Sequence, residues 1–529
     1  MATSLYQEAK NALAHVVSAA FEKAVSAGVL TAVEDFAPAV EIPKDAANGD
    51  LSSPSALALA KPQRKAPKQI AQAILEHMEP YPYFSRYEVA GPGFINAFFS
   101  AEWYAEVLKT VEKMGPKYGS IKEGRNKTVL IEFVSANPTG PMHLGNARGG
   151  VLGDTLASVM EKAGYKVWRE FYVNDAGNQV ALLGQSLEAR YIQHFKGEDA
   201  VEFPENGYHG ADIIALAKAY AAEHGDALLS VPEEERRKAL IAFGLAKNIA
   251  QMKADLARYK VEYDQWFLET SLHDSGYVAE TMQLLEDRGM LYEKDGAKWL
   301  KGTELGMEKD EVLVKSNGFY TYYAVDIAYH RNKLEERGFD KAIDFLGADH
   351  HGHTVRFRAG LEALGIDGKR LEFVLYQLVN LMQNGEVVRM SKRTGNAITL
   401  SNLLDEISVD AARFFFNYRS CDSHLDFDLD LAVKQESDNP VYYVQYAHAR
   451  ICTMLAKLAE EGVLPSACEN TDLSLLALPE EKDLVKKIAL LPEEIRLAAR
   501  DRDPSRMTRY LVELSAAFHS FYSAGRIRG

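Results

Sequence analysis

The sequence is poor in cysteine, in long apolar runs and in positive charge. Its 529 residues contain three cysteines, Cys421, Cys452 and Cys468, spaced too widely for paired zinc ligands or a disulfide framework. We therefore expect a reducing, cytoplasmic setting and no structural zinc. No apolar stretch approaches the length needed to cross a bilayer, so no membrane partner is expected. The formal net charge of −15 argues against a generic polyanion binder.

What the sequence does contain is the composition of a folded protein of several domains, 47% hydrophobic and 26% charged. Helical and strand-like segments alternate in residues 1–117, which predicts a small N-terminal α+β domain. Strand, glycine-rich turn, helix and strand in 118–382 predict a Rossmann-like α/β catalytic domain with a largely helical insertion at about 176–318. Residues 383–436 are a connecting region, and 437–529 predict an α-helical bundle.

A short motif, His143-Leu144-Gly145-Asn146, stands between a buried strand and a helix. The helix start offers unpaired N–H groups and a positive dipole end, and an imidazole there can donate to a phosphate oxygen. Gly145 has no side chain, so a base or ribose can lie against the backbone. Taken alone, four such residues are more often an ordinary strand–helix turn.

A second motif, Arg389-Met390-Ser391-Lys392-Arg393, lies in a loop, and 249 positions (392 − 143) separate Lys392 from His143. Clustered cations beside a glycine can wrap a triphosphate, and an ammonium stabilises the charge of nucleotidyl transfer. A solvated basic loop is the commoner outcome for such a cluster. The fixed order and context of the two motifs make the pair much more specific than either one.

Together the motifs resemble the His-Ile-Gly-His and Lys-Met-Ser-Lys-Ser signatures of class I aminoacyl-tRNA synthetases. Their flanks, 131–157, 172–179, 345–353 and 390–400, resemble bacterial arginyl-tRNA synthetase over essentially the whole chain. The resemblance implies ATP-dependent ligation of L-arginine to tRNA(Arg) through arginyl-adenylate, with Mg²⁺ accompanying ATP, in a monomeric enzyme. A catalytically weak or silent tRNA-binding relative remains the alternative.

The resemblance also implies roles for individual residues. The catalytic residues would be His143, Asn146 and Lys392. The ATP site would consist of His143, Gly145, Asn146, Met390, Ser391 and Lys392. A guanidinium demands carboxylates, and the arginine site would consist of Glu132, Ser135, Asn137, Tyr322, Asp326 and His350. The tRNA contacts would include Lys61, Arg64 and Lys65 in the N-terminal domain and Tyr443 and Tyr446 in the bundle.

Each assignment has an ordinary alternative, and the chain departs from the family pattern. Glu132 could be a surface carboxylate at a strand edge and Asp326 a helical ion pair; the two tyrosines could be bundle core. Asn146 replaces the second histidine of the first signature, and Arg389 replaces the first lysine of the second. The family normally continues beyond RIRG (526–529), so we expect its last C-terminal helices to be lacking.

Overall fold

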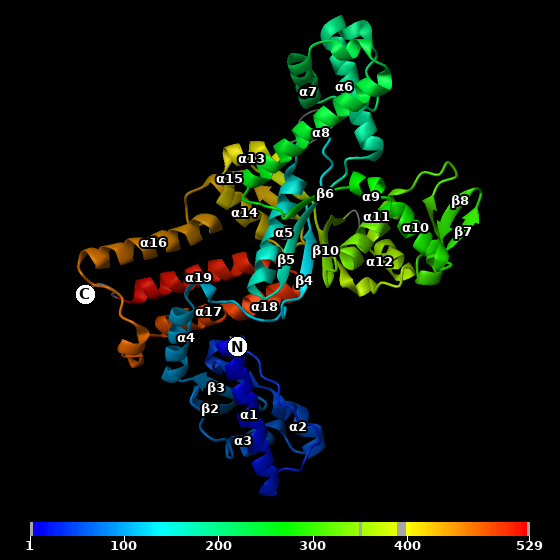
Figure 1. The fold of residues 1–529 in the computed structure, drawn as a ribbon. Helices are drawn as coiled ribbons and strands as arrows, with labels where there is room; N and C mark the ends of the chain where they lie inside the picture. Colours follow the sequence, from blue (N-terminus) through cyan, green and yellow to red (C-terminus); the bar gives the residue numbers. More distant parts are fainter. Residues whose placement is uncertain (1–3, 349–351, 389–397, 526–529) are drawn as a thin grey trace. The chain divides into compact units, whose positions relative to one another are not determined.

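The computed structural model describes residues 4–348, 352–388 and 398–525 (Figure 1). The chain forms two compact units. The first unit combines residues 1–123 with 443–497 and 509–529, and the second combines 124–442 with 498–508. Each unit has a hydrophobic core of its own.

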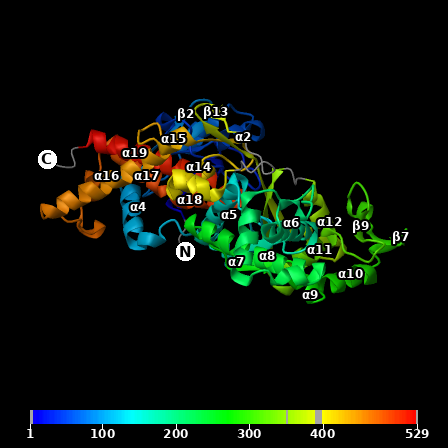
Figure 2. The same ribbon diagram turned by 90° about the horizontal axis from the view of Figure 1, so that it is seen from above.

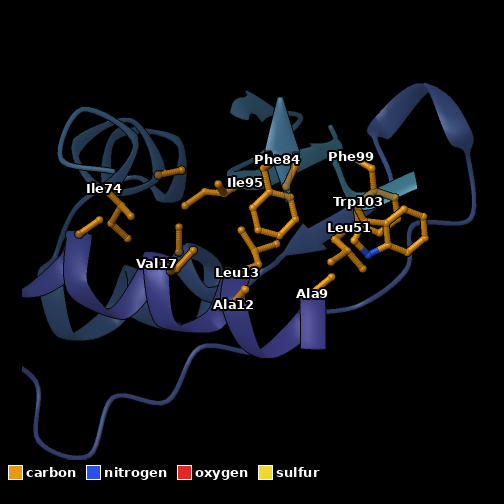
Figure 3. Packing of buried hydrophobic residues seen from close by; sticks show 14 of the residues in the cluster. Ala9, Ala12, Leu13, Val17, Leu51, Ile74, Phe84, Ile95, Phe99 and Trp103 are labelled. Carbon is orange, nitrogen blue, oxygen red and sulfur yellow. The ribbon is translucent and has the colours of Figure 1, made fainter. Parts of the chain in front are cut away.

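The N-terminal part of the first unit packs helices on a small antiparallel sheet of order β1-β3-β2. Leu13 and Val17 of the first helix lie one turn apart and are fully buried, and they meet Ile95, Phe99 and Trp103 in one core (Figure 3). This spacing makes the helix amphipathic, as predicted. The elements are α1 (Leu5–Ser26), β1 (Leu51–Ser53), α2 (Ser55–Gln63), α3 (Pro67–Leu75), β2 (Phe84–Ala90), β3 (Phe94–Phe99) and α4 (Ala101–Met114).

The C-terminal part of the chain is helical, and no strand occurs in its described residues 437–525. Within the first unit, the hydroxyl of Tyr118 donates to the carbonyl of Ile488 at 3.1 Å, and the ammonium of Lys486 lies 3.2 Å from Asp50. These bonds join the C-terminal helices to the N-terminal residues. The helices are α16 (Pro440–Glu460), α17 (Pro479–Ala489), α18 (Leu491–Asp501) and α19 (Ser505–Ala524).

The second unit is built on a five-stranded sheet in which every neighbouring pair is parallel. Its order, β11-β10-β4-β5-β6, has β4 in the middle, with later strands added first on one side and then on the other. The connections therefore reverse between β4 and β10, where ligands bind in doubly wound sheets. The strands are β4 (Thr128–Glu132), β5 (Lys166–Val173), β6 (Gln265–Leu268), β10 (Lys341–Gly347) and β11 (Leu371–Tyr376).

The range 176–318 contains more than helices. Three of its helices lie side by side (Figure 2). The ring of Tyr191 is buried in the hydrophobic cluster that they form. The same range also holds β6 of the central sheet and a small antiparallel sheet of order β7-β8-β9. Its elements are α6 (Gly177–Lys196), α7 (Ala211–His224), α8 (Glu233–Arg258), α9 (Thr270–Asp274), α10 (Tyr277–Asp287), β7 (Leu291–Lys294), β8 (Ala297–Leu300) and β9 (Glu311–Val314).

The remaining elements of the second unit are helices, a π-helical turn and the strands of another small sheet. They include α5 (Leu144–Lys162), α11 (Tyr322–Arg331), the π-helical turn η6 (Asn332–Glu336), α12 (His353–Ala363), β12 (Val379–Gln383), β13 (Glu386–Val387), α13 (Leu400–Glu406), α14 (Val409–Asn417), β14 (Leu425–Asp428) and α15 (Leu429–Val433). The fold class predicted from the sequence is confirmed in all three parts, whereas the predicted domain boundaries stay a prediction.

Candidate functional site

The turn after β4 holds an unusual backbone. Val134 and Ser135 have φ of 70° and 42°, in the left-handed region that a β-branched residue rarely adopts. Such a conformation costs about 1–3 kcal/mol and persists where the surroundings fix it. Here the hydroxyl of Ser135 donates to Glu132 Oε1 at 2.8 Å and accepts the N–H of Tyr172 at 3.1 Å. The turn thus folds Ser135 back onto the last residue of the strand.

The predicted motif His143-Leu144-Gly145-Asn146 forms the N-terminal cap of helix α5. The N–H of Gly145 donates to His143 Nδ1 at 3.1 Å, and the N–H of His143 donates to Asn146 Oδ1 at 3.1 Å. Because Nδ1 accepts, a neutral imidazole carries its proton on Nε2. The cap holds the ring at the positive end of the helix dipole, where a phosphate would be stabilised.

The segment after the second motif pairs directly with the first. Lys392, Ser391, Met390 and Arg389 lie outside the described residues. The N–H of Leu400 donates to the carbonyl of Met142 at 2.9 Å, and Thr399 forms an antiparallel bridge with His143. The chain leaving residues 389–397 is therefore joined to the start of α5.

Arg148 of α5 joins the same helix to segments on both sides of the second motif. Its guanidinium is wholly buried and donates to the carbonyls of Gln377 at 2.6 Å, Ser420 at 3.0 Å and Ser423 at 3.0 Å. Its two terminal nitrogens are thus hydrogen-bonded, whereas its buried Nε has no partner among the described residues. Sequence reasoning did not single out this residue.

Two predicted arginine-site residues reach the first turn of α6. The amide of Asn137 donates to Gln179 Oε1 at 2.7 Å. Tyr322, the first residue of α11, is 56% exposed, and a Cβ added at Gly177 would lie 3.4 Å from its hydroxyl. Asn137 therefore binds the first turn of α6, and Tyr322 lies beside it. His350 lies outside the described residues.

Asp326, one turn further along α11, is half-buried and unpaired. Its carboxylate makes no hydrogen bond or ion pair with any residue of the described ranges. Burial raises its pKa to about 7; His330 opposes that rise, and the negative charges of Glu269 and Glu132 add to it. A carboxylate held in this way is stabilised by an incoming cation.

Glu132, unlike Asp326, is paired with a cation. Besides Ser135, its carboxylate accepts from the ammonium of Lys333 at 2.5 Å, and its side chain is 13% exposed. Burial raises its pKa, while Lys333 lowers it. Lys333 and Glu269 were both missed from the sequence. The seven-residue spacing from Asp326 to Lys333 was the available signal for the lysine, while Glu269 follows a short strand that the sequence did not reveal.

In the first unit, the two predicted tyrosines contact a histidine of α19. The rings of Tyr443 and Tyr446 lie 4.8 and 5.8 Å from that of His519. Tyr446 is 42% exposed, and the guanidinium of Arg450 lies 4.5 Å from its ring centroid. An adjoining cavity of about 480 Å³ is lined by Tyr446, Ala449, Arg450, Thr453, Met454, Lys457, Leu458, Tyr522 and Gly525.

The predicted basic stretch of the N-terminal domain is exposed at Lys61, Arg64 and Lys65. The ammonium of Lys65 donates to the carbonyl of Val29. The other two side chains make no ion pair with any described residue, so their charges face solvent. Over the described ranges, no three His, Cys, Asp or Glu side chains could hold a metal ion. Nor does that part of the chain contain a helix long and apolar enough to cross a membrane.

Known protein families match this chain along most of its length. Three families match in order along the chain: "Arginyl tRNA synthetase N terminal domain" at residues 8–99, "tRNA synthetases class I (R), catalytic domain" at 108–422, and "DALR anticodon binding domain" at 444–529. The arginine–tRNA ligase of Acetivibrio thermocellus is 53% identical over 528 residues, covering 100% of this chain and 94% of that protein.

A second relative and a solved structure extend the comparison. The arginine–tRNA ligase of Caldanaerobacter subterraneus is 53% identical over 99% of this chain and 93% of its own length. The structure of Thermus thermophilus arginyl-tRNA synthetase matches with a TM-score of 0.72 at 22% identity, over 98% of this chain and 92% of that one. At that identity the structural match shows the fold alone.

Proposed function

The chain belongs to the arginyl-tRNA synthetase family, and we propose that the carboxyl edge of its parallel sheet is the centre where arginine is activated. The reaction of this family is the ATP-dependent ligation of arginine to tRNA. The alternative of a catalytically silent tRNA-binding relative is not favoured, because the full-length similarity includes the catalytic domain.

Asp326 is the observation that carries the assignment of the arginine site. It is a half-buried carboxylate without a partner among the described residues, and Glu132 and Glu269 are close enough to raise its pKa. A guanidinium stays charged at all physiological pH values and presents a planar set of donors, so it complements such a cluster. In our proposal Asp326 and Glu132 bind the guanidinium, and Tyr322 packs beside it.

The same proposal places the α-amino and carboxylate ends of arginine near Ser135 and Asn137. This assignment rests on the sequence match; in the structure the strained turn after β4 brings Ser135 within hydrogen-bonding distance of Glu132, at 2.8 Å. His350 would add a further substrate contact. Its position lies outside the described residues, so its role rests on the sequence match.

Activation requires that the arginine carboxylate attack the α-phosphorus of ATP, forming the arginyl-adenylate while diphosphate leaves. A hydroxyl of the terminal adenosine of tRNA then attacks the carbonyl carbon and AMP leaves. No protein side chain becomes covalently bound, so positioning and charge stabilisation supply the catalysis. In our proposal His143, Gly145 and Asn146 contact the phosphates and ribose, and Lys392, with Met390 and Ser391, stabilises the α-phosphate.

Magnesium enters this proposal only as part of the nucleotide. Mg²⁺ is usually held by substrate phosphates and a few carboxylates and seldom by an all-protein cage. The absence of a metal-binding cluster from the described ranges is compatible with that arrangement. The tRNA would contact Lys61, Arg64 and Lys65 with its backbone and Tyr443 and Tyr446 with unpaired bases.

The direct test is aminoacylation of tRNA(Arg) by the 529-residue chain with ATP and each of arginine and lysine. We expect arginine to be attached and lysine to be rejected, because the carboxylates match a planar fork of donors. Lys392→Ala should lower the rate of adenylate formation by about a hundredfold. Attachment of another amino acid would refute the specificity, and an unchanged rate would remove Lys392 from the mechanism.

A further inference from the structure

One wholly buried lysine lies beside the proposed arginine site and has no role in the reaction outlined above. Lys333 belongs to η6, the π-helical turn that directly follows α11, and its side chain is 0% exposed. Asp326, His330, Lys333 and Arg337 are spaced by four, three and four residues, so they line one side of the helical segment. Turns of this kind are often found at functional sites.

The ammonium of Lys333 joins two carboxylates from neighbouring strands. It lies 2.5 Å from Glu132 Oε2 of β4 and 2.8 Å from Asp344 Oδ1 of β10. The second oxygen of Asp344 is 2.7 Å from His330 Nε2, and the other nitrogen of that ring is 2.7 Å from the carbonyl of Asp326. An unbroken polar chain therefore runs from Glu132 to the backbone of Asp326.

Burying such a cluster of charged groups costs desolvation free energy. Apolar residues of similar volume often stabilise a fold as well as a buried ion pair, because both charges lose their hydration. Removing the ammonium alone would leave Glu132 without its cation and Asp344 with only His330 beside it, and burial would then favour the neutral form of Glu132. Lys333 therefore favours the ionised form of Glu132 and opposes the effect of burial.

Glu132 differs from its partners in being partly exposed. Its side chain is 13% exposed, whereas the side chains of Lys333 and Asp344 are 0% and 4% exposed. Each carboxylate oxygen has two acceptor sites, and Ser135 and Lys333 each use one. The remaining acceptor sites can receive donors from a bound guanidinium.

We propose that Lys333 is a positioning residue for arginine: its ammonium keeps Glu132 ionised and fixed in orientation at the carboxyl edge of the sheet, ready to accept from the substrate guanidinium. The inference rests on the proposed function and deepens it. Lys333 acts through Glu132 and does not contact the substrate itself.

The test is a double-mutant cycle on the full chain, with aminoacylation of tRNA(Arg) measured as a function of arginine and of ATP. Lys333→Met should raise the KM for arginine about tenfold or more and leave the KM for ATP within about twofold. In a Glu132→Gln background the same change should alter the KM for arginine by less than about threefold, because no carboxylate charge remains to be held.

A matched control separates positioning from general loss of a buried ion pair. Arg337 makes a two-pronged pair with Glu170, at 3.0 and 2.5 Å, and does not touch Glu132. Arg337→Met should lower the melting temperature without changing the KM for arginine by more than about threefold. If Lys333→Met and Arg337→Met changed the KM for arginine equally, the inference would be overturned.

The cycle remains decisive if Lys333→Met does not fold. Glu132→Gln/Lys333→Met removes the carboxylate and the ammonium together and should have the same KM for arginine as Glu132→Gln alone. A difference of more than about threefold between these two would overturn the inference. If the wild-type chain charges tRNA with arginine but the lysine variants behave additively, the inference fails and the proposed function stands; a wild-type chain that does not use arginine refutes the proposed function.

Discussion

At the scale of single residues, the two carboxylates proposed to bind the guanidinium differ in their ion pairing before arginine binds. Glu132 is already paired with an internal cation, whereas Asp326 is unpaired among the described residues and has a pKa of about 7. Binding of arginine therefore gains most at Asp326, where the ion pair is formed anew. It gains less at Glu132, where the incoming donors join an existing ion pair.

Asp326→Asn should raise the KM for arginine by about a hundredfold, because a charge-assisted contact is replaced by a neutral one. The free protein should lose no stability, since the carboxylate has no described partner to lose and its burial is unfavourable. Aminoacylation kinetics and thermal unfolding check the two halves of this prediction. A variant with normal arginine kinetics would move the guanidinium site elsewhere.

Arginine affinity should fall as the pH drops below 7. With a pKa of about 7 in the free protein, Asp326 is mostly ionised at pH 8 and about one-tenth ionised at pH 6, so the dissociation constant should rise about tenfold. Calorimetric titration at the two pH values measures this change. In Asp326→Asn the same interval should show a clearly smaller change, and equal pH dependence in both proteins would contradict the assignment.

Asp326 should also make folding stability depend on pH, but in the opposite direction: stability should rise, not fall, as the pH drops. The pKa of Asp326 rises from 3.8 to about 7 on folding, so between these values the native state binds more protons than the unfolded state. Its contribution to the free energy of unfolding is therefore fully favourable below pH 3.8 and is lost as the pH rises toward 7. Denaturant titrations of wild type and Asp326→Asn across this window should converge toward acid pH and separate toward pH 7, with the variant the more stable.

The residues of the site could be predicted only in part from the sequence. Asp326 and Tyr322 were identified through the family resemblance, but whether Asp326 is paired depends on packing around it. The partner of Glu132, Lys333, is 201 positions away in the chain. No local pattern links residues so distant, and their pairing follows from the packing of η6 on the sheet edge.

At the scale of elements, the approach of α5 to the turn after β4 depends on glycine. A Cβ at Gly153 would lie 2.2 Å from the ring of Phe133, the residue that precedes the strained Val134. The fully buried helix face at this point leaves no space for the ring to move away. Helix position and turn conformation are therefore coupled.

Gly153→Ala should lower the free energy of unfolding by about 1–3 kcal/mol through overpacking. It should also raise the KM for arginine, because displacement of Phe133 disturbs the turn that carries Ser135. Gly352→Ala is the matched control: its φ is −63° and an added Cβ would have no described residue within 4 Å, so stability should be unchanged or slightly higher. Equal stabilities of the two variants, measured by denaturant unfolding, would contradict this account of α5.

The strongest elements were predictable because their patterns are local. Residues 128–132 form a short apolar run, and three of them are fully buried in β4 as that pattern predicts. Strand β6, in contrast, has four residues and lies within a range predicted to be a helical insertion. Its place in the sheet is set by pairing with β5, which no property of the segment itself reveals.

At the scale of the whole molecule, a net charge of −15 must be reconciled with a polyanionic partner. Charge acts locally because screening limits its range to about 8–10 Å at physiological salt. Two exposed cations that lack ion pairs in the described ranges, such as Lys61 and Arg64, can therefore attract phosphates on an acidic protein. The sequence could suggest this stretch, but the exposure of its charges required the structure.

Lys61→Ala/Arg64→Ala should raise the KM for tRNA several-fold. In a plot of log KM for tRNA against log salt concentration, the slope should fall by about one for each phosphate contact removed. The KM values for arginine and ATP should not change. Lys113→Ala/Lys117→Ala, which removes two exposed lysines outside the predicted stretch, is the matched control. Both double variants change the net charge from −15 to −17 (−15 − 2). An equal loss of tRNA affinity in the two would therefore assign the effect to total charge, whereas a loss confined to the first pair would locate a tRNA contact on the N-terminal domain.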